Sequence, residues 1–351
     1  MTPRLPSFPR ASGGDPSPLS SSPQAFGGDP SPLWSSPRAS GGDPGVGRKA
    51  GFPPDTAGTT RVNVVVPAGF WRGPVALLRH GFPPKAAGTT ILLCFALLLG
   101  GAHAQEERLK PALGALERGD HAQAIDTLRP LAAEGIVEAQ YLLGLSLENA
   151  PEPHGNLQAA RDWYLRAAQA GHPSAQNNLG AMHYDGRGAA RDLAEALRWY
   201  RLAASQDHPE AQTNLGLLYG LGQGVARDSA EMAKLLKKAA DSGFARAQAQ
   251  LARLYLDGDG VEQNPGEAAR LFGLAARQGH EWAQYYLGSL LQKGHGIERN
   301  LEAAHEWFLK AAERGHRPAM GELARIYEMG LGAPADEAKA KLWRERAEAD
   351  R

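Results

Sequence analysis

The chain has 351 residues with 38 basic and 38 acidic side chains, so its formal net charge at pH 7 is zero. After residue 104 the counts are 29 Lys and Arg against 34 Asp and Glu, a balance of about −5 with His neutral. This balance argues against a nucleic-acid partner, because such proteins normally carry a basic face.

Residues 1–74 form a low-complexity segment that we expect to be disordered or untranslated. Sixteen of the 25 prolines lie before residue 85, and no Glu occurs before Glu106. Such a composition buries too little apolar surface to offset the entropy cost of ordering. The Gly-Gly-Asp-Pro sequence at residue 13 recurs with a period of 14, and the stretch from Gly51 to Thr60 recurs 30 residues later. Tandem copies without a structural period suggest translated non-coding repeats and a start codon assigned too far upstream.

Residues 75–104 have the features of a signal peptide. Basic residues precede a short apolar run from Ile91 to Leu99, and Ala102-His103-Ala104 has the small-x-small form of a signal peptidase site. The run is shorter than the ~20 residues that span a bilayer, which favours a cleaved signal over a membrane anchor. We therefore predict a mature chain that begins at Gln105 and lacks Cys94, the only cysteine. Residues 105–134 follow as an N-terminal capping hairpin.

From residue 135 to residue 351 the sequence repeats every 36 residues, without insertion or deletion, through six units. A fixed period in this range indicates a stack of units that bury their apolar faces against one another. Three columns define the first half of each unit: Ala139, Ala175, Ala211, Ala247, Ala283 and Ala319; Leu143, Leu179, Leu215, Leu251, Leu287 and Leu323; then Gly144, Gly180, Gly216, Ala252, Gly288 and Ala324.

Each unit contains two segments with helical spacing. Residues 209–219 illustrate the first, with apolar side chains at i, i+4, i+7 and i+8. The second segment begins at a column of N-cap residues, and Glu195, Glu231 and Glu267 stand three residues after their caps, as in a capping box. The N-cap column is Asn156, Asp192, Asp228, Asn264, Asn300 and Asp336. The units end at glycine, which suits a left-handed cap, except at Asp207.

The motif Ala-x-x-x-Leu-Gly-x-x-Tyr-x-x-Gly-x-Gly, followed by the Asp/Asn cap and Ala-Ala-x-x-Gly-His, resembles the Sel-one-like repeat, a relative of the tetratricopeptide repeat. The match is close at residues 211–219 with Gly222, Gly224 and Val225, and the resemblance covers about residues 108–351. The first unit departs from it, because its turn at residues 148–153 lacks the glycine pair. The resemblance and the period together predict an all-α fold: a right-handed α-solenoid of 36-residue helical hairpins.

Candidate chemical motifs are better explained as structure. The glycine pair of Gly222 and Gly224 resembles a phosphate loop, but it recurs in five units, as a turn would and a catalytic loop would not. The histidine column lies one repeat apart, at ~10 Å, which is too far to share a metal ion. These histidines are His172, His208, His280 and His316. We expect no catalytic residue, cofactor or metal.

The columns at −2, −1 and +2 from the repeated Leu vary freely. In tetratricopeptide relatives the matching positions line a concave groove that holds peptide, so we predict partner contacts there, although these side chains could merely be solvated. Tyr285 and Tyr286 are the strongest candidates, since rigid aromatic side chains are typical contact residues. The predicted partner-binding residues are Asn177, Asn178, Thr213, Asn214, Gln250, Arg253, Tyr285, Tyr286 and Ser289.

The sequence thus predicts an exported scaffold, periplasmic or secreted, that binds a protein or peptide through its concave face and has no catalysis. We expect a monomer with no membrane span after signal cleavage. Two alternatives remain. Some cysteine-rich relatives are described as β-lactamases, but a mature chain without cysteine weakens that implication. The other alternative is a glycan-binding envelope protein that uses the Tyr and Asn positions.

Overall fold

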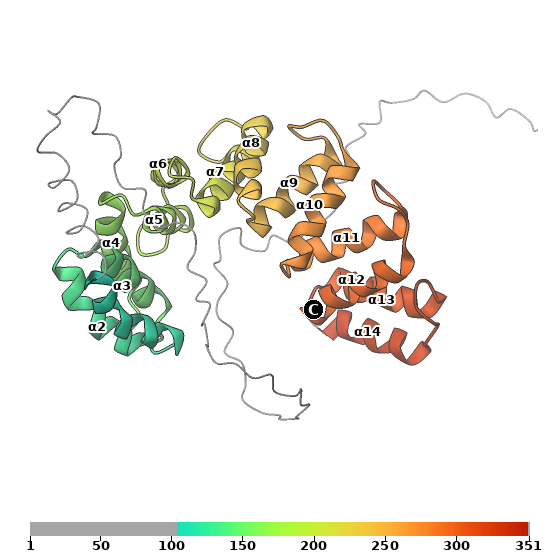
Figure 1. Ribbon diagram of the computed structural model, residues 1–351, viewed down its shortest axis with the longest axis horizontal. Helices are drawn as coiled ribbons and strands as arrows, with labels where there is room; N and C mark the ends of the chain where they lie inside the picture. Colours follow the sequence, from blue (N-terminus) through green and yellow to red (C-terminus); the bar gives the residue numbers. More distant parts are fainter. Residues whose placement is uncertain (1–103, 350–351) are drawn as a thin grey trace, which may run out of the picture. The chain divides into compact units, whose positions relative to one another are not determined.

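The computed structural model describes residues 104–349, and these are helices joined by turns (Figure 1). The predictions for residues 1–74 and 75–103 lie outside this range. Residues 104–117 are helical, and thirteen further helices follow. They are α2 (His121–Ala133), α3 (Val137–Asn149), α4 (Leu157–Gln169), α5 (Pro173–Asp185), α6 (Leu193–Ala204), α7 (Pro209–Leu221), α8 (Ser229–Asp241), α9 (Ala245–Asp257), α10 (Pro265–Arg277), α11 (Glu281–Lys293), α12 (Leu301–Glu313), α13 (Arg317–Met329) and α14 (Glu337–Ala349).

Each helix from α3 to α13 packs against the helices before and after it in the sequence, and the tightest pairs are the two helices of one repeat, such as α7 with α8. Six such pairs, from α3 with α4 to α13 with α14, follow one another along the chain (Figure 1). The predicted all-α solenoid of helical hairpins is therefore confirmed. Residues 104–117 and α2 precede these pairs, and their role as a cap remains a prediction.

The predicted N-caps are confirmed at all six second helices. Each cap side chain accepts a hydrogen bond from a backbone N–H in the first turn, as Asp228 does from Glu231 at 2.9 Å. The reciprocal bond of a capping box does not form. The cap N–H instead donates to a carbonyl nine residues earlier, in the first helix of the same repeat, as from Asp228 to Tyr219 at 2.9 Å. The Glu side chains are then available to solvent and cations, and Glu195 pairs with Arg198.

The turns carry the predicted left-handed residues. Gly222 and Gly224 have φ of 66° and 69°, and the equivalent glycines of four other repeats are also positive. Asp207, which replaces the terminal glycine of its unit, has φ of 59° and is the only non-glycine residue with positive φ among the described residues. A side chain with a Cβ is thus held in a conformation that favours glycine.

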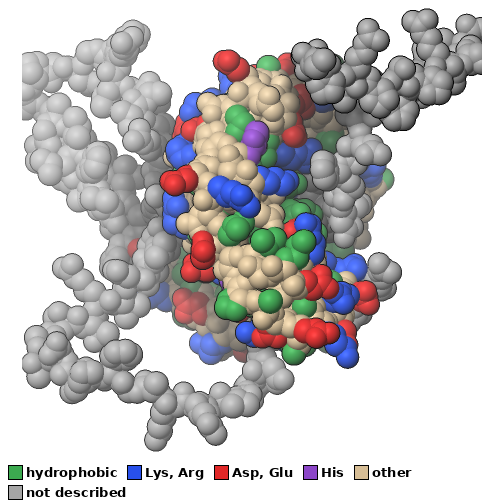
Figure 2. Space-filling view, turned by 90° about the vertical axis from the view of Figure 1, so that its right-hand side faces the viewer, with side chains coloured by type: hydrophobic (Ala, Val, Ile, Leu, Met, Phe, Trp, Pro, Cys, Tyr) green, Lys and Arg blue, Asp and Glu red, His purple; other side chains and the backbone are tan. Residues whose placement is uncertain are grey.

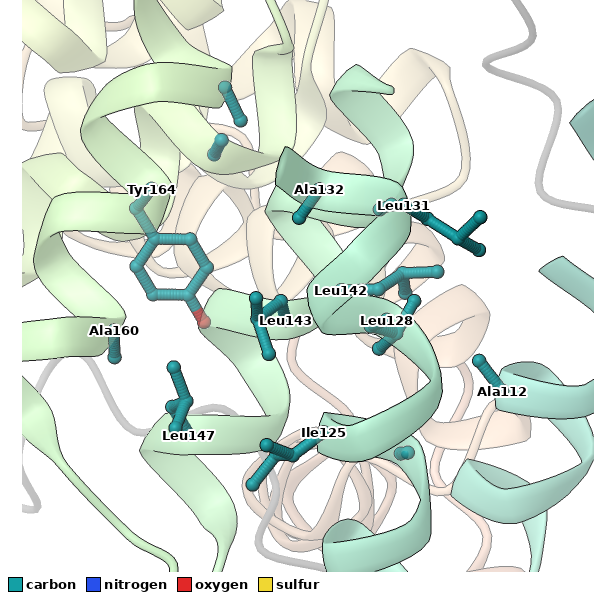
Figure 3. Packing of buried hydrophobic residues seen from close by; sticks show 14 of the residues in the cluster. Ala112, Ile125, Leu128, Leu131, Ala132, Leu142, Leu143, Leu147, Ala160 and Tyr164 are labelled. Carbon is teal, nitrogen blue, oxygen red and sulfur yellow. The ribbon is translucent and has the colours of Figure 1, made fainter. Parts of the chain in front are cut away.

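The core lies between the two helices of each repeat and between repeats. The Gly column allows an aromatic ring of the second helix to lie against the first: a Cβ at Gly180 would come within 2.9 Å of two atoms of the buried Tyr200 ring. Figure 3 shows the equivalent Tyr164 pointing toward Leu143 and Leu147 of the preceding helix. Large rings and absent side chains therefore interlock, which is how close packing is reached here.

The surface mixes charges of both signs. On the face drawn in Figure 2, Lys and Arg side chains alternate with Asp and Glu, and hydrophobic side chains lie among them. Among residues 104–349, no helix has the length and apolar content that crossing a bilayer requires.

Candidate functional site

The predicted partner contacts lie on the first helix of each repeat, namely α3, α5, α7, α9, α11 and α13. We call the side chains at −5, −2, −1 and +2 from the repeated Leu of these helices the variable face. The structure places six of the nine predicted residues at least partly at the surface, and Arg253 is the most exposed of them. The other five are Asn178, Gln250, Tyr285, Tyr286 and Ser289.

The remaining three are buried, contrary to the expected exposure: Asn177 and Asn214 are 2% exposed and Thr213 is fully covered. Their polar groups are satisfied inside the protein. Asn214 Nδ2 donates to Asn177 Oδ1 at 3.0 Å, and the Thr213 hydroxyl donates to the carbonyl of Pro209 at 2.8 Å. Hydrogen bonding of this kind offsets the cost of removing a polar group from water.

The Asn pair belongs to a side-chain hydrogen-bond network that crosses several repeats. From Asn177 it continues to Asn178 at 3.4 Å. The Tyr164 hydroxyl, beside Asn178, donates to Glu148 Oε2 at 2.7 Å. Burial, followed by the Glu148 charge, raises the pKa of Tyr164 well above its usual value, so the phenol stays protonated as a donor. The network fixes polar groups of α3, α4, α5 and α7 relative to one another.

At its other end the network reaches a pair of opposite charges. Arg246 of α9 donates to Asn214 Oδ1 at 3.4 Å and lies in the electrostatic field of Glu210, one repeat earlier. Both side chains are half-buried. Burial raises the pKa of Glu210 and lowers that of Arg246, and in each case the opposite charge of the partner counteracts the shift. Partly desolvated charges interact more strongly with a bound group than charges in open water.

An aromatic group occupies the variable face of α11. The Tyr286 ring stacks on Phe272 of α10 with ring centres 5.0 Å apart, and Tyr285 meets Tyr286 edge to face at 5.5 Å. Trp282 lies one turn earlier, 6.5 Å from Tyr286. Tyr285 and Tyr286 are both half-buried, and their rings are held by packing against the neighbouring aromatic side chains. Rigid aromatic side chains of this kind lose little entropy when a partner binds.

The histidine column consists of N-cap residues of the first helices. In each repeat that has the histidine, its Nδ1 accepts from the backbone N–H three residues later, at 3.1–3.3 Å. The Nε2 atom therefore carries the proton, and in His208 it lies 3.2 Å from the Ser174 hydroxyl. Burial lowers the pKa of His208 and of His316 to about 4, so both caps are neutral at pH 7. These contacts agree with the interpretation as turn residues.

Sequence reasoning missed the column five residues before the repeated Leu. Its members contact the histidine of the next repeat or the network: Glu138 lies 3.1 Å from His172 Nε2, and Trp282 meets His316 edge to face at 4.6 Å. The signal was present, because this column changes among Glu138, Ser174, Glu210, Arg246, Trp282 and Pro318 while the next column is always Ala.

The model of the Sel1 repeat family matches six consecutive segments: residues 137–172, 173–208, 209–244, 245–280, 283–316 and 317–349. A Sel1 repeat protein from Oxalobacter formigenes has a similar structure, with TM-score 0.61 and 31% identity, over 68% of this chain and 96% of that one. No curated protein matches the sequence.

A second similar structure is c5321, described as a protective antigen present in uropathogenic Escherichia coli strains and displaying an SLR fold. It has TM-score 0.60 and 33% identity, and the match covers 64% of this chain. The chain spans about half of that protein, 48% of its length.

Proposed function

This chain belongs to the Sel1 repeat family, and we propose that it is an exported scaffold that binds a protein or peptide partner through the variable face of its first helices. The observation that carries the proposal is that the variable columns hold the polar network and the aromatic group, while the columns beside them hold the repeated core. The Ala and Leu columns that fold the repeat are the same in every unit, whereas the partly exposed side chains of the variable face differ from unit to unit.

The chemistry of the face suits a peptide in two ways. Asn178 and Gln250 are partly exposed amides, which can hydrogen-bond a peptide backbone. Tyr285 and Tyr286 are partly exposed aromatic side chains held by packing, and such side chains are typical centres of binding energy. The network holds the Asn178 amide through Asn177 before a partner arrives, which lowers the entropy cost of binding.

We test the proposal with Tyr286→Ala and Arg253→Ala, using partners cross-linked to the wild-type protein in an envelope extract, identified by mass spectrometry and then purified. Each change should weaken binding of the purified partner by about 1–3 kcal/mol, measured by calorimetry. Lys237→Ala is the matched control: Lys237 and Arg253 are both 62% exposed and each pairs with an Asp four residues on, but Lys237 lies on the second helix α8.

Tyr286 also stacks on Phe272, so the melting temperature of the Tyr286→Ala protein is measured in the same samples. A loss of binding in Arg253→Ala with an unchanged melting temperature, and none in Lys237→Ala, supports the variable face. Equal binding by all three variants would move the partner surface elsewhere on the protein.

Export rests on the sequence of residues 75–104. Cleavage of this signal would give a periplasmic or secreted protein whose mature N-terminus is Gln105, and N-terminal sequencing of the native protein checks this. Recovery of residues before Val75 would contradict both the cleaved signal and the reassigned start.

A further inference from the structure

A polar hollow of about 460 Å³ lies at the ends of α10 and α12, and none of its lining residues belongs to the variable face. Its wall includes the Trp307 ring with the Lys310 ammonium 4.2 Å from the ring centre, and Gln284 of α11, only 3% exposed, also lines it. The remaining lining residues are Ala276, Arg277, Gln278, Gly279, Glu313 and Arg314.

The floor of this hollow has an acceptor without a donor. Gln284 Nε2 donates to the carbonyl of Ala276 at 3.1 Å, as the same glutamine does in four earlier repeats, but Gln284 Oε1 is buried without a hydrogen-bond partner. A buried acceptor left unpaired destabilises the fold, because it has lost its hydrogen bond to water without gaining another. The position is therefore prepared for a group that brings an N–H or O–H.

The repeat itself shows why the acceptor is open. In two other units a second glutamine, 30 residues later, closes this position: Gln206 donates to Gln176 at 2.8 Å and Gln278 donates to Gln248 at 2.9 Å. The residue 30 positions after Gln284 is Arg314. Its guanidinium lies over Gly279, 3.0 Å from where a Cβ would stand, and it makes no hydrogen bond to Gln284. The glutamine donor that two other units have is thus absent at the hollow.

Three cations surround the open acceptor: Arg277, Lys310 and Arg314. Within residues 104–349 none of them forms an ion pair with a carboxylate, although Glu313 also lines the hollow. The carbonyl end of each helix attracts one cation in its last turn, Arg277 in α10 and Lys310 in α12. Arg314 follows α12 as a third cation beyond these two. The hollow therefore has an excess of positive charge beside a flat aromatic wall.

We propose that this hollow binds an acidic peptide segment, whose backbone N–H donates to Gln284 Oε1 while its carboxylates pair with Lys310, Arg314 and Arg277. A peptide supplies both requirements within one residue, a donor and a negative acceptor. The Trp307 ring offers apolar surface to the stem of a Glu side chain. This site shares no residue with the variable face, so its test is independent of the test of the proposed function.

The test uses fluorescein-labelled hexaglutamate and measures fluorescence anisotropy at low salt. Lys310→Met and Arg314→Gln should each weaken binding at least about tenfold, the effect of one charged hydrogen bond. Arg314→Gln also restores the glutamine that closes the acceptor in other repeats, so its melting temperature should not fall. Lys238→Met is the matched control, because Lys238 occupies the place of Lys310 two repeats earlier, and it should change binding less than about twofold.

A second probe isolates the donor. Hexaglutamate with every backbone nitrogen methylated keeps its carboxylates but has no backbone N–H, and it should bind the wild-type protein at least about fivefold more weakly. Equal binding of the two peptides, or equal loss in Lys238→Met and Lys310→Met, would overturn the proposal. Tighter binding of an oligoglucuronate than of hexaglutamate would overturn it in favour of an acidic glycan.

Discussion

The glycine that follows each repeated leucine gives the sharpest test of the packing. We predict that Gly180→Ala destabilises the protein and that Gly216→Ala does not, although both glycines lie in the middle of a first helix. A Cβ at Gly180 would lie 2.9 Å from two atoms of the fully buried Tyr200 ring, whereas at Gly216 the nearest atom is the Met232 carbonyl oxygen at 3.3 Å.

Two effects of known size compete at these positions. Replacing Gly by Ala inside a helix stabilises it by about 1 kcal/mol. Forcing a methyl group into a filled core costs about 1–3 kcal/mol. At Gly216 the Met232 carbonyl has to yield by only a few tenths of an ångström, so the first effect prevails and we expect a gain of about 0.5–1 kcal/mol. At Gly180 the Tyr200 ring has no space to move, so we expect a net loss of about 1–2 kcal/mol.

Urea denaturation followed by circular dichroism measures both variants through the shift of the transition midpoint at a common slope. The midpoints of Gly180→Ala and Gly216→Ala should move in opposite directions. If both midpoints shift in the same direction, the Tyr200 ring is not the reason that residue 180 is a glycine, and the interlocking of rings and glycines is incorrect.

Three further changes probe other elements. Leu215→Ala removes a side chain that is 5% exposed and should cost about 2–5 kcal/mol in the same assay; a cost under 1 kcal/mol would mean that the column is not core. Asp207→Gly should raise stability by about 0.5–1 kcal/mol, because φ of 59° suits glycine, and a loss would show that the Asp side chain has a structural role. His208 should make stability depend on acid: its folded pKa of about 4 lies below the unfolded value near 6.5, so its contribution is present above pH 6.5 and lost as pH falls toward 4. His208→Asn keeps a cap without titration and should reduce this loss in urea midpoints taken from pH 7 to 4; an unchanged loss would assign the effect to other groups.

The helices, caps and turns could be predicted from the sequence because each signal recurs in five or six units. Asn and Asp recur at the start of the second helix because their side-chain oxygen accepts a hydrogen bond from a backbone N–H two or three residues later. Such a short-range interaction can be recognised from the sequence spacing. The capping box fails for a reason that lies outside the helix: the N–H of Asp192 is already bonded to the carbonyl of His183.

The site was less predictable because its bonds join residues that are far apart in sequence. Asn177 and Asn214 are polar, and polar residues are mostly exposed, so a surface position was the natural expectation. Their mutual bond spans 37 residues and crosses a repeat boundary, which periodicity alone does not show. The cap role of His208 was missed because histidine is not among the leading cap residues.

The bond from each second-helix cap to the first helix also limits how the chain can evolve. The Asp228 N–H reaches the Tyr219 carbonyl nine residues earlier, and at the other connection the His208 N–H reaches the Ala203 carbonyl five residues earlier. An added or lost residue in either connection would separate a donor from its acceptor. The first unit keeps the nine-residue spacing, from Asn156 to Leu147, even though Ala150 and Glu152 replace its glycine pair. Loop length is thus closed to variation in this stack, and new binding properties have to arise by exchanging side chains within a constant frame.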